Sequence, residues 1–248
     1  MEVKRRKNKK IVLRRRLLLG VAAAALIVLL ALGGKAISDA VKKAGYRVLD
    51  ENEIAAALER GRQAGQSTGE AEKTEVEDPE ADRPEAEGLA EAAVSLVGKV
   101  HYFWGGKSSA LGMDPRWGEI TEVTSTDSET SGTLRPFGLD CSGFVSWCFI
   151  QLGYSPQEVE ELVGNGTWNQ WDRTQDIPWK QLRLGDFVFM NRYPTDQGNH
   201  IGICVGFEES GAPVFAHCSS GFDNVVVTTA GDVFRYARRP NVLAQAQP

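Results

Sequence analysis

One uncharged, apolar run near the N-terminus sets the topology of everything that follows it. Residues 17–34 read LLLGVAAAALIVLLALGG and contain no charged or strongly polar side chain. Eighteen helical residues are just long enough to cross the hydrocarbon core of a bilayer. The sequence therefore predicts a single transmembrane helix over residues 17–34. A buried core helix is a poor alternative, because nothing in this terminus is amphipathic.

The charges on either side of this run predict its orientation. Residues 1–16 hold nine Lys and Arg against one Glu, a net charge of +8, whereas only Lys35 follows the run directly. Because positively charged flanks stay on the cytoplasmic side, we expect a basic cytoplasmic tail over residues 1–16 and an extracytoplasmic remainder in the cell membrane. A cleaved signal peptide is the alternative, although both the apolar run and the basic segment are long for one.

Composition excludes two broad classes of protein. The whole chain carries a net charge of −5, so residues 17–248 carry −13 and the positive charge is confined to one end. That asymmetry is not the pattern of a nucleic-acid-binding protein, which spreads basic residues over its folded surface. The four cysteines include no CxxC pair, and this excludes a dense disulfide framework.

The composition changes twice after the apolar run and divides the chain. Residues 35–65 have helical composition and predict a juxtamembrane helical segment. Residues 66–88 contain nine acidic side chains and two prolines between Glu70 and Glu87, with few apolar side chains, and predict an acidic disordered spacer. Residues 89–240 then form one domain of typical size, followed by a short C-terminal tail over residues 241–248.

Within residues 89–240, helical patterns come first and strand patterns follow. Helices are expected over residues 89–98 and 142–152, on either side of an irregular segment, 107–138, that is rich in Gly, Ser, Thr, Asp and Pro. After residue 181 short β-rich runs alternate with turn residues: DFVFMN, HIGICVGF, PVFAHCSS, NVVVTTA and FRYARRP. This order predicts an α+β domain, with N-terminal helices packed on an antiparallel sheet.

Cys141 lies where a loop meets the second predicted helix, in the stretch GLDCSG. Unpaired backbone N–H groups and the positive end of the helix dipole at such a position lower the pKa of a thiol. A thiol with a lowered pKa is what a cysteine nucleophile requires. Cys148, two helical turns further on in an apolar run, is expected to be a buried small hydrophobic residue.

The chain has only three histidines, and two of them fall on consecutive predicted strands. A four-residue hairpin loop would place His217 opposite Gly202 and on the same sheet face as His200. This geometry suits a general base, His200, that activates Cys141, together with a second imidazole, His217, that fixes the tautomer of the first. His101 has no partner in this scheme.

Two other interpretations of these side chains stay open. A zinc site would draw on Cys141, His200, Cys204, His217 or Cys218. However, His200 and Cys204 would lie roughly 13 Å apart along a strand, and the adjacent pair at 217 and 218 would point to opposite faces. We therefore expect no metal and no other cofactor. Purely structural roles for the histidines are the second interpretation.

Five motifs, taken in order, resemble the NlpC-type cell-wall cysteine peptidases, a papain-like family. They are HYFWGG (101–106), DCSGFV (140–145), LRLGDFVF (182–189), HIGICVG (200–206) and FAH (215–217). The resemblance covers nearly all of residues 89–240. It implies a papain-like α+β fold in which Cys141 is the nucleophile, His200 the base and His217 the third, polar member of a catalytic triad.

The same resemblance implies a substrate and further site residues. Members of the family are typically peptidoglycan endopeptidases that cut stem peptides, usually between γ-linked D-glutamate and a diamino acid. Tyr102 matches a tyrosine that lines the site near the oxyanion, and Asp140 and Ser142 match positions that contact a free substrate amine in some members. The chain departs from the family pattern in the 33 residues between Gly106 and Asp140, a longer gap than usual, so subsite preference does not transfer.

The expected partners are peptidoglycan stem peptides and the membrane, which the N-terminal helix would enter. Two alternatives to a hydrolase remain: a non-catalytic wall-binding or assembly module of the same fold, and a relative that transfers acyl or amide groups with the same nucleophile. The sequence identifies neither an envelope-complex partner nor a biological process.

Overall fold

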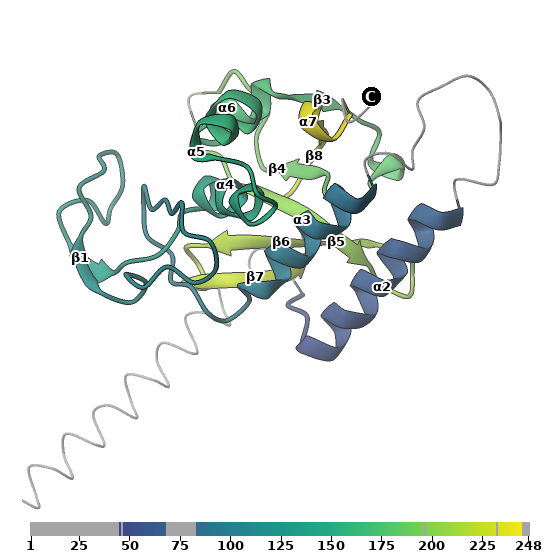
Figure 1. Cartoon of the computed structure of the whole chain (residues 1–248), viewed down its shortest axis with the longest axis horizontal. Helices are drawn as coiled ribbons and strands as arrows, with labels where there is room; N and C mark the ends of the chain where they lie inside the picture. The colour runs from purple at the N-terminus through teal and green to yellow at the C-terminus, as the bar shows by residue number, and fades with distance from the viewer. Residues whose placement is uncertain (1–44, 46, 68–82, 196, 232, 245–248) are drawn as a thin grey trace, which may run out of the picture. The chain divides into compact units, whose positions relative to one another are not determined.

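The computed structural model describes residue 45 and residues 47–67, 83–195, 197–231 and 233–244 (Figure 1). The expected cytoplasmic tail and the expected transmembrane helix over residues 17–34 lie outside this part of the chain, as does most of the expected acidic spacer. No helix within the described ranges combines the length and the apolar character needed to cross a bilayer.

A six-stranded, fully antiparallel sheet forms the centre of the molecule. Its spatial order is β3-β8-β4-β5-β6-β7. The strands are β3 (Thr174–Asp176), β4 (Phe187–Phe189), β5 (Ile201–Phe207), β6 (Pro213–Ser219), β7 (Asn224–Thr229) and β8 (Tyr236–Pro240). The predicted meander is confirmed for β4 to β7, which are neighbours both along the chain and in the sheet, while β8 returns to pair with β4.

Helices cover one face of this sheet, as predicted for an α+β domain. The main ones are α2 (Glu51–Ser67), α3 (Arg83–Ser95) and α4 (Cys141–Gln151). Figure 1 shows α2 and α3 running across the sheet in front of β5 and β6. The shorter ones are α5 (Pro156–Glu158), the π-helix η1 (Val159–Val163), α6 (Thr167–Asp172), the 3₁₀-helix η2 (Trp179–Gln181) and α7 (Asn241–Ala244).

Alternation along the strands divides the apolar side chains between two cores. On β5, Ile201, Ile203 and Val205 face the helices and join the large core formed with α2, α3 and α4. On the opposite face Cys204 joins a smaller cluster with Phe215 and several neighbours, namely Leu182, Val188, Phe234 and Ala237. Burying apolar surface on both faces stabilises the central strands.

The folded unit begins earlier than we expected. We placed its start at residue 89 and treated residues 35–65 as a separate juxtamembrane segment, but α2 belongs to the same compact unit as the sheet. Ile54, Ala57 and Leu58 are buried in the helix-side core. Their i, i+3, i+4 spacing makes an apolar stripe, which predicts the apolar face of a helix but does not say which element that face packs against. A side-chain Cβ at Gly206 of β5 would lie 2.2 Å from the Ala57 carbonyl oxygen, so the helix lies directly on the strand.

Two further boundaries differ from the sequence prediction. Helix α3 begins at Arg83, inside the expected spacer 66–88, so its start precedes the expected residue 89. At the other end, the expected tail 241–248 begins with α7, whose Leu243 is buried against the core. In both cases the apolar contact is made by one or two residues, which leave no periodic signal in the sequence.

The long segment between Gly106 and Asp140 is ordered and carries its own hairpin. Strands β1 (Ile120–Glu122) and β2 (Leu134–Pro136) pair antiparallel, and Figure 1 shows this insertion lying to one side of α4. The ring of Trp117 lies 5.7 Å from the ring of Trp147 on α4. The insertion is therefore fixed against the helix that begins at Cys141.

Candidate active site

Two glycine-containing motifs pack against each other and set the position of Cys141. Tyr102 forms a parallel bridge with Leu139, and the Phe103 N–H donates to the Leu139 carbonyl at 3.0 Å. A side-chain Cβ at Gly143 would lie 2.1 Å from the Gly106 carbonyl oxygen. Only glycine at 143 permits this close approach. The packing brings Tyr102 next to Cys141, although 38 residues separate them in the sequence.

Asp140 is the N-cap of α4, which starts at Cys141, one residue before the expected position. The Asp140 Oδ1 atom accepts hydrogen bonds from the Gly143 N–H at 2.6 Å and from the Ser142 hydroxyl at 2.8 Å. Such a cap satisfies backbone donors that the helix itself leaves unpaired. The Asp140 and Ser142 side chains, expected to contact substrate, are thus bound to each other and to the first turn.

The pKa of the Cys141 thiol is raised, not lowered as we predicted. Burial is the main cause and the Asp140 carboxylate adds to it, so the pKa rises to about 12. Lys107 and the backbone N–H groups of Ile201 and Ser142, which hydrogen-bond to the sulfur, oppose this rise. Only 6% of the residue is exposed, and desolvation of the thiolate outweighs the effect of the helix end. The resting thiol is therefore neutral.

His200, His217 and Thr228 form a hydrogen-bonded chain. His200 Nε2 lies 2.8 Å from His217 Nδ1, and His217 Nε2 lies 3.0 Å from Thr228 Oγ1. If the Thr228 oxygen accepts from His217, then His217 Nδ1 accepts from His200, and His200 Nδ1 is left unprotonated. Burial lowers the pKa of His200 to about 4 and also lowers that of His217, so both rings are neutral at pH 7.

The sheet brings the two histidines together by a route that differs from the prediction. The connection between β5 and β6 has five residues instead of four, and a bulge between Cys204 and Gly206 shifts the register by one position. The two differences cancel, because Ile203 pairs with Ala216 and His217 consequently lies opposite Gly202. The predicted register is confirmed, although neither the loop length nor the bulge was foreseen.

Phe234 is a site residue that the sequence analysis missed. Its ring stacks on His200 with 5.6 Å between centroids and an interplanar angle of 15°, and it meets His217 edge-on at 5.3 Å. A Cβ at Gly202 would lie 2.9 Å from the tip of the Phe234 ring. The small residue at 202 thus makes room for Phe234.

Thr228 was also missed, and the strand register could have identified it. His217 pairs with Val226 across β6 and β7. Residues two apart on a strand share a face, so Thr228 is the diagonal neighbour of His217 on the buried side. We placed Thr228 in the β-rich run NVVVTTA but gave it no role, because a threonine near the end of a strand carries no catalytic signal by itself.

Tyr102 and His101 are fixed by one carboxylate. The Asp223 Oδ1 atom accepts from the Tyr102 backbone N–H at 3.1 Å, and Oδ2 lies 3.0 Å from His101 Nδ1. His101, for which we found no partner in the sequence, thus pairs with Asp223 in the turn before β7. Burial, with Cys141 and Asp140 nearby, raises the pKa of Tyr102 well above its usual value, so its hydroxyl keeps its proton.

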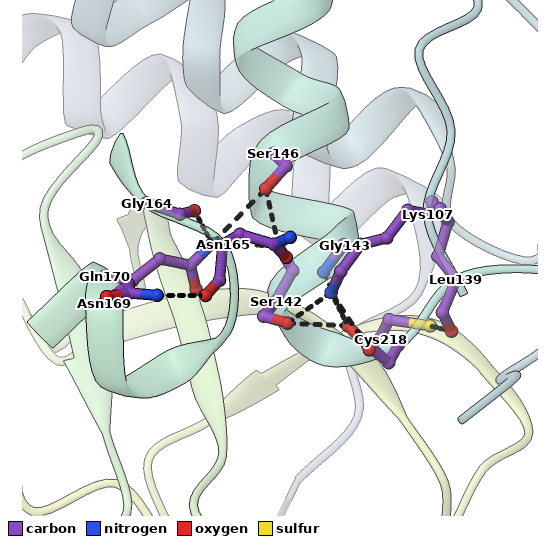
Figure 2. A network of polar contacts seen from close by, with 11 residues as sticks. Lys107, Leu139, Ser142, Gly143, Ser146, Gly164, Asn165, Asn169, Gln170 and Cys218 are labelled. Atoms are coloured by element: carbon purple, nitrogen blue, oxygen red, sulfur yellow. Dashed lines mark hydrogen bonds and ion pairs between the residues drawn. The ribbon is translucent and has the colours of Figure 1, made fainter. Parts of the chain in front are cut away.

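Gln170 of α6 supports the first turn of α4 from the other side. It is fully buried, and its Nε2 donates to the Ser142 carbonyl oxygen at 2.9 Å. Figure 2 shows this amide reaching toward Ser142 and Ser146, with Lys107 approaching the same turn from the opposite side. The start of α4 is therefore held from both sides.

The remaining cysteines are not part of the hydrogen-bonded chain of His200, His217 and Thr228, although Cys218 lies near Cys141 and Tyr102. Cys148, Cys204 and Cys218 are buried and, like Cys141, unpaired in the described structure. Cys218 faces the helices and lies 3.1 Å from the Leu139 carbonyl, whereas His217 faces Phe234 on the other side of the sheet. The described residues contain no group of three or more His, Cys, Asp or Glu side chains that could hold a metal ion.

Two hollows lie near or behind the site. A cavity of about 280 Å³ lies on the flank of α4, and among its lining residues are Lys107, Arg116, Ser146, Glu160 and Asn165. A larger one, of about 740 Å³, lies between α2, η2 and the β5–β6 turn. The larger cavity contains none of the side chains that gather around Cys141, so size alone does not mark the site.

The sequence from residue 98 to residue 229 matches the family model described as the NlpC/P60 family. The chain belongs to the NlpC/P60 family. This confirms the resemblance drawn from the motifs, and the matched range includes Cys141, His200, His217 and Thr228. No curated protein matches the chain.

Solved structures of NlpC/P60 proteins and peptidoglycan hydrolases show distant likeness. The peptidoglycan hydrolase RipB from Mycobacterium tuberculosis is 20% identical, with a TM-score of 0.43, over 76% of this chain and 82% of that chain. An NLP/P60 family protein similar to lipoprotein, from Staphylococcus aureus, is 21% identical, with a TM-score of 0.38, over 71% of this chain and 46% of that chain. Because both TM-scores are below 0.5, membership of the family rests on the family model.

Proposed function

We propose that this NlpC/P60 chain is a peptidoglycan endopeptidase that hydrolyses a stem-peptide amide bond with a Cys-His-His triad. The proposed bond joins γ-linked D-glutamate to the diamino acid. The observation that carries the proposal is the chain His200–His217–Thr228, in which the first imidazole neighbours Ile201, whose N–H meets the Cys141 sulfur. Family membership supports peptidoglycan as the substrate class.

The pKa values of the two reacting groups determine how the reaction would begin. Because the pKa of Cys141 is about 12 and that of His200 about 4, both are neutral at rest. His200 Nδ1 would take the thiol proton as the sulfur attacks the amide carbonyl. His217 would act as the positioning residue that keeps His200 Nε2 protonated and Nδ1 available.

The charge formed on the carbonyl oxygen needs nearby donors. The backbone N–H of Cys141 at the start of α4 is one such donor, and the Tyr102 hydroxyl, which keeps its proton because its pKa is raised, is the second. The protonated His200 would then give its proton to the leaving amine. Water would hydrolyse the thioester, with His200 again taking a proton, to release the acid and restore the thiol.

The test is digestion of purified peptidoglycan with the full-length chain and with Cys141→Ala. Mass spectrometry of the products should show new stem-peptide termini at the D-glutamyl and diamino acid residues with the intact protein only. Termini at another position of the stem would refute the proposed bond while keeping the peptidase. No new termini with the intact protein would refute the proposed function.

One observation favours a second candidate function. The Cys141 thiol is buried and neutral, as it would be in a non-catalytic wall-binding module. Such a module would bind peptidoglycan in a pull-down assay equally well with Cys141→Ala and would release no peptides. The digestion experiment therefore separates the two candidates directly.

We also propose that residues 17–34 anchor the chain in the cell membrane, with residues 1–16 in the cytoplasm and the folded unit outside. The support is the apolar run and its basic flank. The chain should remain with membranes after washing with sodium carbonate, and protease added to spheroplasts should digest the folded unit. A chain found in the soluble fraction, beginning after residue 34, would instead indicate a cleaved signal peptide.

A further inference from the structure

Lys107 reaches the first turn of α4, where its ammonium group has three hydrogen-bond acceptors. Its Nζ donates to Asp140 Oδ1 at 2.8 Å, to Asp140 Oδ2 at 3.0 Å and to Ser142 Oγ at 2.6 Å. Figure 2 shows the side chain extending across Gly143 to this turn. An ammonium group has three N–H donors and no acceptor, so these partners can engage all of its hydrogens.

The path of this side chain is built into the fold. A Cβ at Gly143 would lie 3.0 Å from Lys107 Cδ and 2.1 Å from the Gly106 carbonyl, so the glycine makes room for the lysine as well as for the neighbouring backbone. The Asp140 side chain is 11% exposed and that of Lys107 is 35% exposed. A buried carboxylate needs a charge partner, and Lys107 supplies it from its own chain.

The cavity beside Lys107 holds a second cation, whose charge is also paired with a carboxylate. Lys107 and Arg116 both line the cavity of about 280 Å³ on the flank of α4, and Glu160 is the acidic residue among its lining side chains. Arg116 is held there by two hydrogen bonds to Asp114, at 2.6 and 3.0 Å. A second positive group entering beside Asp140 and Ser142 would have to displace Lys107 or lie against it, and like charges in contact are unfavourable.

We propose that Lys107 is a specificity-determining residue that makes the site accept stem peptides without a free ammonium group beside Asp140 and Ser142. An acylated amine, as at the amino end of a stem peptide still joined to its glycan, carries no charge and avoids the conflict. Free peptides released from the wall carry an ammonium group at that end and are rejected. The inference rests on the proposed function for the identity of the substrate.

Two peptides that differ only in their amino end test this selection. They are L-Ala–γ-D-Glu–diamino acid–D-Ala with a free N-terminal amine and the same peptide N-acetylated. We expect the full-length chain to cleave the acetylated peptide with at least a tenfold higher kcat/KM. Lys107→Met should lower that ratio at least tenfold, because it exposes the Asp140 carboxylate to the substrate amine. An unchanged ratio in Lys107→Met would overturn the proposal.

Two matched variants separate charge from folding. Lys107→Arg keeps the positive charge and should keep the preference for the acetylated peptide, whereas its loss would overturn the proposal. Lys180→Met removes a lysine from the 740 Å³ cavity, away from α4, and should leave both kcat/KM values unchanged. A shift as large as that of Lys107→Met would show that the preference follows net charge and would also overturn the proposal.

A thiol-labelling experiment tests the same charge effect without hydrolysis. Cys141 in the full-length chain is labelled with cationic aminoethyl methanethiosulfonate or neutral methyl methanethiosulfonate, and peptide mass spectrometry measures its modification. Lys107→Met should raise the ratio of cationic to neutral labelling rates at least fivefold, and Lys180→Met should not. If Lys107→Met raises the labelling ratio but the chain cleaves no peptide, the proposed function is refuted and the charge discrimination by Lys107 is kept. If the labelling ratio does not change, the charge discrimination by Lys107 is refuted.

Discussion

His217 lies between His200 and Thr228, with one ring nitrogen 2.8 Å from His200 Nε2 and the other 3.0 Å from Thr228 Oγ1. Both rings are neutral because burial lowers their pKa values. A neutral imidazole has one donor and one acceptor nitrogen, so the hydrogen bond at one end of this chain sets the tautomer at the other. The role of the Thr228 hydroxyl, as donor or acceptor, is thus linked through His217 to the tautomer of the proposed base.

His217→Ala should lower kcat by about 100-fold, since correct placement of a general base contributes that much or more. Cys141 should remain alkylatable by iodoacetamide, because its position depends on α4 and not on His217. The measurement combines peptide hydrolysis with mass spectrometry of alkylated Cys141. Unchanged hydrolysis kinetics would contradict the positioning role.

Thr228→Val removes the last hydrogen bond of the chain and keeps the shape of the side chain. The loss of one buried hydrogen bond is worth about 1 kcal/mol, and we expect kcat to fall about fivefold with KM nearly unchanged. Thr229→Val is the matched control, because residue 229 follows on the same strand but points to the opposite face. Equal effects of the two substitutions would show that Thr228 acts on stability alone.

Stability should fall on acidification between pH 6.5 and pH 4. The folded pKa of His200, about 4, is below the value of 6.5 in the unfolded chain, and that of His217 is also lowered. The unfolded state therefore binds more protons in this window, so the stability present above pH 6.5 is lost as the pH falls. Carboxyl groups with a lowered pKa, such as Asp114, lose their contribution to stability only at lower pH.

Thermal midpoints at pH 7.5, 6.0 and 5.0 check this prediction. The double variant His200→Gln, His217→Gln keeps every carboxylate and should show a smaller fall between pH 7.5 and pH 5.0. Burial raises the pKa of Asp186, so its contribution to stability increases as the pH falls. Because Asp186 is present in both proteins, this contribution cancels in the comparison. An equal fall in the two proteins would assign the effect to other groups.

Gly143→Ala should destabilise the fold by about 2 kcal/mol or more, because overpacking a close contact forces the backbone to shift. The added Cβ would lie 2.1 Å from the Gly106 carbonyl. Gly198→Ala is the control, since a Cβ there meets no atom within 4 Å. Urea unfolding of the two variants measures the difference, and similar midpoints would show that the two motifs can separate at little cost.

Helix α2 should be required for folding, because its apolar stripe belongs to the core. Ile54→Ala is expected to lower the free energy of unfolding by about 2–5 kcal/mol, as for other buried aliphatic truncations. A fragment of residues 45–248 should unfold cooperatively, whereas a fragment of residues 89–248 should not. Circular dichroism during heating distinguishes them, and a cooperative transition in the shorter fragment would contradict this role of α2.

The sequence was most informative where chemistry depends on local pattern. The α+β order and the start of α4 near Cys141 were predictable, because helix periodicity and strand alternation are local properties. The register that joins His200 to His217 was predicted correctly only because the unforeseen loop length and bulge offset each other. The sequence was least informative where distant segments meet. Phe234 and Lys107 reach the site from separate parts of the chain, and no spacing of residues in the sequence predicts such contacts.

The pKa of Cys141 shows a different limit of sequence reasoning. A helix start lowers a thiol pKa in a solvated setting, and that was the basis of the prediction. The degree of burial is a tertiary property, and here desolvation and Asp140 dominate. The predicted limits of the domain were wrong for a related reason. The attachment of α2 and α7 to the core is also a tertiary property, and a few side chains make it.

The attachment of α2 to the sheet changes the tether length of the proposed membrane enzyme. The acidic residues between α2 and α3 connect two helices of one folded unit, so they cannot lengthen the link to a membrane. Only the dozen or so residues between positions 34 and 47 remain for that purpose, and a fully extended chain of that length spans roughly 40 Å. For a chain anchored as proposed, this length sets the upper limit of the link between the bilayer and the first residue of the folded unit.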